Sequence, residues 1–124
     1  MGQLRLFLVL LMVDWAFGIP GVGVETRTGG GNDVMNWVYS VVGLALVVAL
    51  ALTWFRRAWA RPLAMAVGAI AVVLAIADMV GLTSGQPAPV AMVVVDVGGI
   101  VIGAAIVWAA SRRPRSAALA GGPL

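Results

Sequence analysis

The chain has 124 residues, of which 62% are hydrophobic and 10% charged. This is more apolar than soluble domains, which hold roughly 45–50% apolar residues, and a chain this short has little interior in which to bury the excess. It contains neither cysteine nor histidine, which excludes disulfide bonds, thiolate chemistry and ordinary zinc, haem or iron–sulfur sites. The composition predicts an integral membrane protein without a metal or a redox cofactor.

Four apolar segments predict four transmembrane α-helices. They cover residues 4–20, 35–55, 62–82 and 88–110. The last three hold 21 to 23 residues, enough to cross a hydrocarbon core of roughly 30 Å, and the first holds 17. We therefore expect an all-α integral membrane protein: one four-helix transmembrane bundle over residues 1–110 with short loops, then a disordered arginine-containing cytoplasmic tail at 111–124.

The first segment has a second interpretation, as a cleavable signal peptide. Residues 1–18 carry an arginine, then an apolar run, then a small-residue end. Asp14 beside Trp15, just before such a cleavage site, would be unusual. This favours a retained helix, while cleavage would leave three spans in the same orientation.

The positions of the arginines predict the orientation. All eight basic residues are arginine, and a single one, Arg27, lies in the glycine-rich external loop expected at 21–34. The other seven flank the opposite side of the spans, and the positive-inside rule then places both termini in the cytoplasm. The residues expected at lipid headgroups are Arg56, Arg57, Arg61, Arg112, Arg113 and Arg115.

The arginines also indicate what the protein contacts and what kind of genome encodes it. Because the arginines lie at membrane boundaries, the sequence pI of about 11.2 indicates contact with lipid rather than with nucleic acid. The exclusive use of arginine over lysine, with abundant alanine, glycine and valine, favours a GC-rich bacterial genome. The expected location is the inner (plasma) membrane.

Three aspartates lie inside the apolar segments. Counted along their spans, Asp14, Asp78 and Asp96 all fall in the half of the membrane opposite the arginines, and Asn36 and Ser40 lie at a similar depth. An acid in lipid is costly and marks a functional site by default. These five residues are candidates for a partner contact or an ion site. The alternative is that the acids hydrogen-bond inside the bundle and only stabilise it.

Two stripes of small residues adjoin these acids. Small residues spaced by three or four positions share one helix face and let two helix backbones approach closely. We therefore expect both stripes to face protein rather than lipid. They comprise Ala64, Gly68, Ala71 and Ala75 before Asp78, and Gly99 and Gly103 after Asp96.

These features favour a non-catalytic accessory or assembly subunit of a larger membrane complex, such as a multisubunit transporter or a respiratory assembly. The chain is small, its loops are short, and its acids and small-residue faces suit docking to larger integral membrane subunits. An enzyme of lipid metabolism is disfavoured, because the scattered aspartates match no catalytic constellation.

The alternative is a small homo-oligomeric transporter or channel coupled to protons or cations through Asp14 and Asp96. Four short helices with a carboxyl group in the first resemble the small multidrug resistance transporters in outline, and Asp14 takes a place comparable to that family's glutamate. The rest of that family's pattern is absent. The arginine asymmetry also enforces a single orientation, which disfavours an antiparallel pair.

Overall fold

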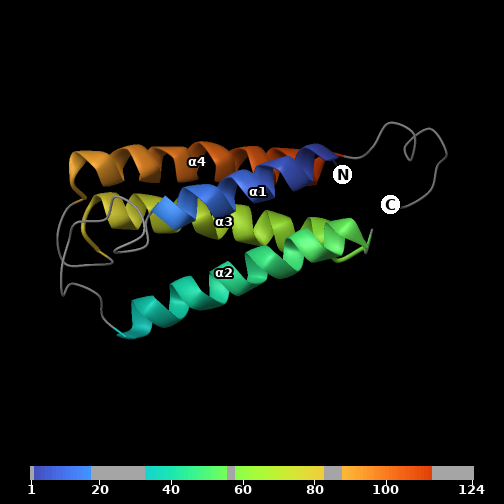
Figure 1. Cartoon of the computed structure of the whole chain (residues 1–124), viewed down its shortest axis with the longest axis horizontal. Coiled ribbons are helices and arrows are strands. Elements are labelled where there is room, and N and C mark those ends of the chain that lie inside the picture. The colour runs from blue at the N-terminus through green and yellow to red at the C-terminus, as the bar shows by residue number, and fades with distance from the viewer. Residues whose placement is uncertain (1, 18–32, 56–57, 83–87, 113–124) are drawn as a thin grey trace.

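A computed structural model describes residues 2–17, 33–55, 58–82 and 88–112. This part of the chain is all helical and consists of α1 (Gly2–Phe17), α2 (Asp33–Trp54), α3 (Ala60–Met79) and α4 (Val90–Ser111). Successive helices run in opposite directions, so α1 begins and α4 ends at the same end of the bundle (Figure 1). The predicted glycine-rich loop before α2, and the predicted tail from residue 113 onward, lie outside the described residues.

Three of the four helices are long and apolar enough to cross a membrane. These are α2, α3 and α4, whose apolar stretches hold 18 to 22 residues. Helix α1 has 16 residues, and at 1.5 Å per residue it spans about 24 Å, less than a hydrocarbon core of roughly 30 Å. The structure thus supports three of the four predicted spans by length and composition, and α1 is short.

Proline and glycine mark the helix ends. Pro62 lies in the first turn of α3, where its missing N–H costs no hydrogen bond, and Pro89 precedes α4 in an extended conformation. Gly81 ends α3 with a φ of 85°, in the left-handed region. The Gly81 amide donates to the Asp78 carbonyl at 3.1 Å and the Leu82 amide to the Ala77 carbonyl at 2.9 Å. This Schellman motif satisfies two of the last carbonyls of α3.

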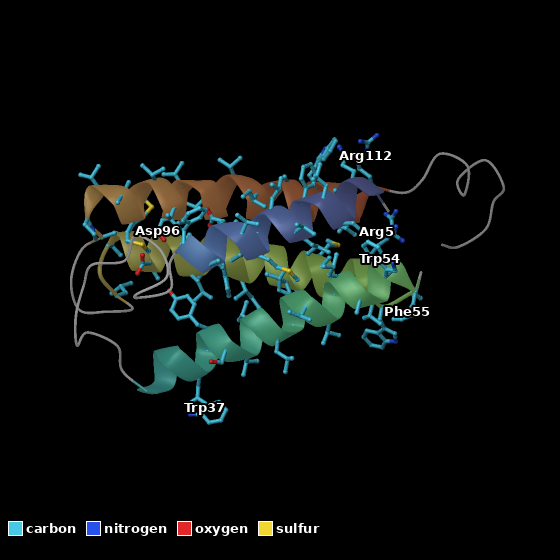
Figure 2. All side chains as sticks on the ribbon, in the orientation of Figure 1. Arg5, Trp37, Trp54, Phe55, Asp96 and Arg112 are labelled. Carbon is cyan, nitrogen blue, oxygen red and sulfur yellow. The ribbon has the colours of Figure 1, made fainter. Side chains whose placement is uncertain are left out.

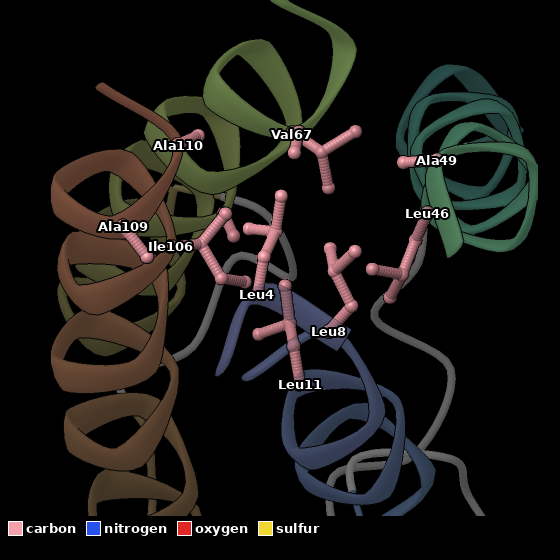
Figure 3. Close-up of a cluster of buried hydrophobic side chains, with 11 residues drawn as sticks. Leu4, Leu8, Leu11, Leu46, Ala49, Val67, Ile106, Ala109 and Ala110 are labelled. Atoms are coloured by element: carbon pink, nitrogen blue, oxygen red, sulfur yellow. The ribbon is translucent and has the colours of Figure 1, made fainter. Parts of the chain in front are cut away.

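Helix α1 supplies the middle of the hydrophobic core. Helix α4 packs against α3 and α1, and α2 packs against the same two helices. Leucines at positions 4, 8 and 11 share one face of α1 and are almost completely buried. Figure 3 shows them among apolar side chains of the other three helices, including Leu46 of α2, Val67 of α3 and Ile106 of α4.

Helix α2 is attached mainly through its C-terminal half. Figure 1 shows it diverging from α3 and α1 toward its N-terminal end. Its buried positions are spaced by four, three and four residues, which is one face of a helix. They are Val42, Leu46, Ala49 and Thr53. Large apolar side chains cover much of its remaining described surface.

Candidate functional site

The structure places all three predicted aspartates in one half of the bundle. Asp14 lies in the last turn of α1, Asp78 in the last turn of α3 and Asp96 in the second turn of α4. Because the helices alternate in direction, these positions fall on the same side (Figure 2 labels Asp96 there). We call this half the aspartate end. The opposite half carries Arg5, Arg61 and Arg112 and is called the arginine end.

The small-residue stripes of α3 and α4 pack against each other within this chain. A Cβ added to Gly68 would lie 2.7 Å from the carbonyl oxygen of Gly103, and a Cβ added to Gly103 would lie equally close to the carbonyl oxygen of Gly68. The two helix backbones are therefore in direct contact. Closer to the aspartate end, the Cβ of Ala75 lies 3.7 Å from the position of a Cβ on Gly99.

This register brings Asp78 and Asp96 to the same level. Asp78 lies three residues beyond Ala75 on α3, and Asp96 lies three residues before Gly99 on the antiparallel α4. Both side chains are 7% exposed. Two carboxyl groups are thus buried on the facing sides of α3 and α4, rather than turned toward lipid.

Asp14 reaches the same region from α1. Its Oδ1 lies 2.6 Å from where a Cβ on Gly98 would stand, and its Oδ2 lies 3.1 Å from the corresponding position on Gly99. The missing side chains of two successive glycines therefore make room for the Asp14 carboxyl group against α4. Gly98 was not among the residues singled out from the sequence. The signal that identifies it is the glycine doublet two positions after Asp96.

The two polar candidates on α2 are placed differently from the acids. Ser40 is exposed in the N-terminal half of α2, and the side chain of Asn36 lies outside the described residues. Nearby, the rings of Trp15 and Tyr39 meet edge to face with centroids 5.8 Å apart. A Cβ on Gly43 would find its nearest neighbour, the Cζ3 atom of Trp15, at 4.0 Å. Packing between α2 and α1 is loose at this point.

Arginine side chains at the arginine end bind carbonyl groups of neighbouring helices. Arg5 donates from Nη2 to the carbonyl of Thr53 at 2.8 Å, and its guanidinium lies 4.7 Å from the Trp54 ring centroid. The last carbonyls of a helix lack partners within the helix, so Arg5 caps α2 and ties α1 to it. Nothing in the local sequence indicates this contact, because it joins residues 48 positions apart.

Two of the six arginines predicted at lipid headgroups are described. Arg61, in the first turn of α3, donates from Nη1 to the carbonyl of Ala110 at 3.4 Å and to the carbonyl of Arg112. Arg112 lies over the Trp108 ring, 4.5 Å from its centroid. The other four, Arg56, Arg57, Arg113 and Arg115, lie outside the described residues.

Chemically, the aspartate end offers two carboxyl groups buried between α3 and α4 and a third, that of Asp14, against α4. In the part of the chain that the structure describes, no group of three or more histidine, cysteine, aspartate or glutamate side chains is placed to hold a metal ion. No known protein family, curated protein or solved structure matches this chain.

Proposed function

We propose that this protein is a non-catalytic accessory subunit of a larger bacterial membrane complex, and that it docks through α2 against a transmembrane helix of a partner subunit. The observation that carries the proposal is the uneven packing of the bundle. Helices α3 and α4 are in backbone contact, whereas α2 diverges from the others and leaves space beside Gly43.

Ser40 supports α2 as the docking helix. The small-residue stripes of α3 and α4 and the buried acids Asp78 and Asp96 face other helices of the same chain, which leaves them little surface to offer a partner. Ser40 instead lies exposed within an apolar stretch of α2. Serine and glycine favour close helix–helix contact in membranes, and Ser40 and Gly43 share one face of α2.

The orientation follows from the arginine end. It carries three described arginines, and positive charge is retained on the cytoplasmic side of a bacterial inner membrane. We infer that α1 begins and α4 ends in the cytoplasm, with the aspartate end toward the outside. Helix α1 would then sit against the longer helices and reach only part of the way across the membrane, or locally thin it.

Site-specific photocrosslinking tests the docking surface. A photoreactive amino acid replaces Leu44, which is 65% exposed on α2 one turn after Ser40, and in a matched control it replaces Val73, which is 64% exposed on α3. After crosslinking in intact cells and purification by a C-terminal tag, the Leu44 variant is expected to carry a defined protein partner. The Val73 variant is expected to crosslink mainly to lipid. Equal crosslinking from both positions, or a lone species from Leu44, would contradict the proposal.

A second candidate, proton- or cation-coupled transport, is favoured by one specific contact. The Asp14 carboxyl group occupies the space that Gly98 and Gly99 leave on α4, which we call the glycine notch, directly beside the turn that carries Asp96. Coupled transport needs a carboxyl group that gains and loses a proton or a cation inside the membrane. In proteoliposomes, Asp14→Asn and Asp96→Asn should each abolish such a flux, and a flux that survives both changes would exclude this function.

A further inference from the structure

Hydrogen bonds of Arg61 join α3 to α4 at the arginine end. Arg61 of α3 donates to the carbonyl of Arg112, the residue that follows α4, and to that of Ala110. These bonds hold the start of α3 against the end of α4. They also bring two arginines, 51 residues apart in the sequence, to one place.

The side chain of Arg112 is exposed and oriented by an aromatic ring. Its guanidinium lies over Trp108, which is itself 51% exposed. Stacking on a ring face uses none of the five N–H donors of a guanidinium, so these donors remain suited to a planar or tetrahedral oxyanion. Figure 2 shows Arg112 at the arginine end of the bundle, on the side of α4 that faces away from the other helices.

The charge balance at this end selects an anionic ligand. Among the described residues of the arginine end, three are arginines and none is acidic, whereas the aspartates of the helices lie at the aspartate end. The arginine end is the one we place on the cytoplasmic side, where basic sites between transmembrane helices suit the phosphate groups of lipids. Guanidinium groups bind phosphate oxygens through paired hydrogen bonds.

The surface of α4 next to this site is apolar. Val94, Val97 and Val101 are exposed at spacings of three and four residues, on the helix face that continues to Trp108. An acyl chain can follow this stripe while its headgroup lies at Arg112. A soluble phosphate compound would make no use of it, which favours a lipid as the source of the phosphate.

We propose that Arg112, stacked on Trp108 and held at the junction by Arg61, binds the phosphodiester of an anionic phospholipid whose acyl chain lies along the exposed valines of α4. The proposal does not depend on α2 or on a partner subunit. It refines the six arginines predicted at lipid headgroups to one site on the α3–α4 junction.

Native mass spectrometry of the full-length protein in detergent tests this site. The protein is titrated with phosphatidylglycerol and with phosphatidylcholine carrying the same acyl chains. Phosphatidylglycerol should bind more tightly, and Arg112→Gln should weaken it about fivefold, the effect of one interfacial arginine. Arg112→Lys keeps the charge but loses the paired hydrogen bonds. Its affinity for phosphatidylglycerol should lie between those of the wild type and Arg112→Gln.

The matched control is Arg5→Gln, which removes the same charge from the same end but from the α1–α2 contact. It should leave phosphatidylglycerol affinity within about twofold of the wild type, since the Arg5 guanidinium is engaged by the Thr53 carbonyl and the Trp54 ring rather than by α3 or α4. An equal loss in Arg5→Gln and Arg112→Gln would show general surface electrostatics and overturn the site. So would equal affinity for the two lipids. Glycerol phosphate that displaces the lipid at millimolar concentration would show a soluble-phosphate site and refute the lipid assignment.

Discussion

The α3–α4 contact and the attachment of α2 are built in different ways. Between α3 and α4, Gly68 and Gly103 leave no space for even a methyl group, and the backbones touch. Helix α2 is held by a short apolar face near its C-terminal end, and beside Gly43 a methyl group would fit without displacing anything. Apolar burial does not drive helices together in lipid, so close packing decides the strength of each contact. Helices α3 and α4 should therefore act as one unit, from which α2 separates first.

The change expected to have the largest effect removes the side chain that connects the two regions. Leu8 of α1 is fully buried in the cluster that contains Leu46 of α2 and Val67 of α3 (Figure 3). Leu8→Ala should lower the free energy of unfolding by about 2–3 kcal/mol, because it leaves a cavity and removes packing contacts among the helices. The measurement is unfolding by SDS in mixed micelles, followed by circular dichroism.

Leu6→Ala provides the matched control, because Leu6 lies on the exposed face of the same helix. It should change the free energy of unfolding by less than about 0.5 kcal/mol. The pair also tests whether α1 is retained in the mature protein. If residues 1–18 were removed as a signal peptide, intact mass would show the loss and neither variant would alter the stability of the purified protein.

One methyl group added in each region provides the most direct comparison. Gly68→Ala should destabilise the protein by about 2 kcal/mol, since the new Cβ meets the backbone of α4, which cannot move aside cheaply. Gly43→Ala should be neutral or stabilise α2 by about 0.5 kcal/mol, because alanine is the better helix former and its Cβ has space. Equal losses in the two variants would mean that α2 is packed as tightly as α4.

A smaller effect is expected where α1 meets α4. Gly98→Ala places a Cβ 2.6 Å from Oδ1 of Asp14, the end of a short side chain that can shift at moderate cost. We expect a loss of about 1 kcal/mol in the free energy of unfolding. In an Asp14→Ala background the same change should cost almost nothing, since the oxygen it displaces is gone. A double-mutant cycle measures this coupling, and strictly additive losses would show that Asp14 does not occupy the notch.

Local sequence patterns predicted the helices but not their contacts. Long apolar runs and the prolines at 62 and 89 located α3 and α4 to within three residues at each end. The spacing of glycine and alanine indicated packing faces on both helices. It did not indicate whether the opposing helix belongs to this chain or to another, because that depends on how each helix is rotated. The register that brings Asp78 level with Asp96 depends on the same rotation.

Contacts that join distant segments had no local signal at all. The hydrogen bond from Arg5 to the Thr53 carbonyl uses a backbone acceptor, and every residue has one. The place of Gly98 against Asp14 likewise depends on where α1 crosses α4. The shortness of α1 was visible as a marginal apolar run, but its central place in the core was not, since its sequence is apolar on all sides.

The smallest effect is expected in the N-terminal half of α2, which diverges from the other helices. The edge-to-face contact between Trp15 and Tyr39 joins α1 to the diverging half of α2, and such ring pairs contribute about 0.5–1.5 kcal/mol. Tyr39→Leu should therefore lower global stability by about 0.5 kcal/mol, near the limit of measurement, because this half of α2 contributes little to the core. Hydrogen exchange offers a sharper readout: protection should fall in the N-terminal half of α2 and stay unchanged in α3 and α4. Tyr39→Phe keeps the ring, so the difference in protection between the two variants separates the ring contact from the contribution of the hydroxyl group. Loss of protection spread over all four helices would mean that α2 opens together with the α3–α4 unit, and the bundle would then be a single cooperative body.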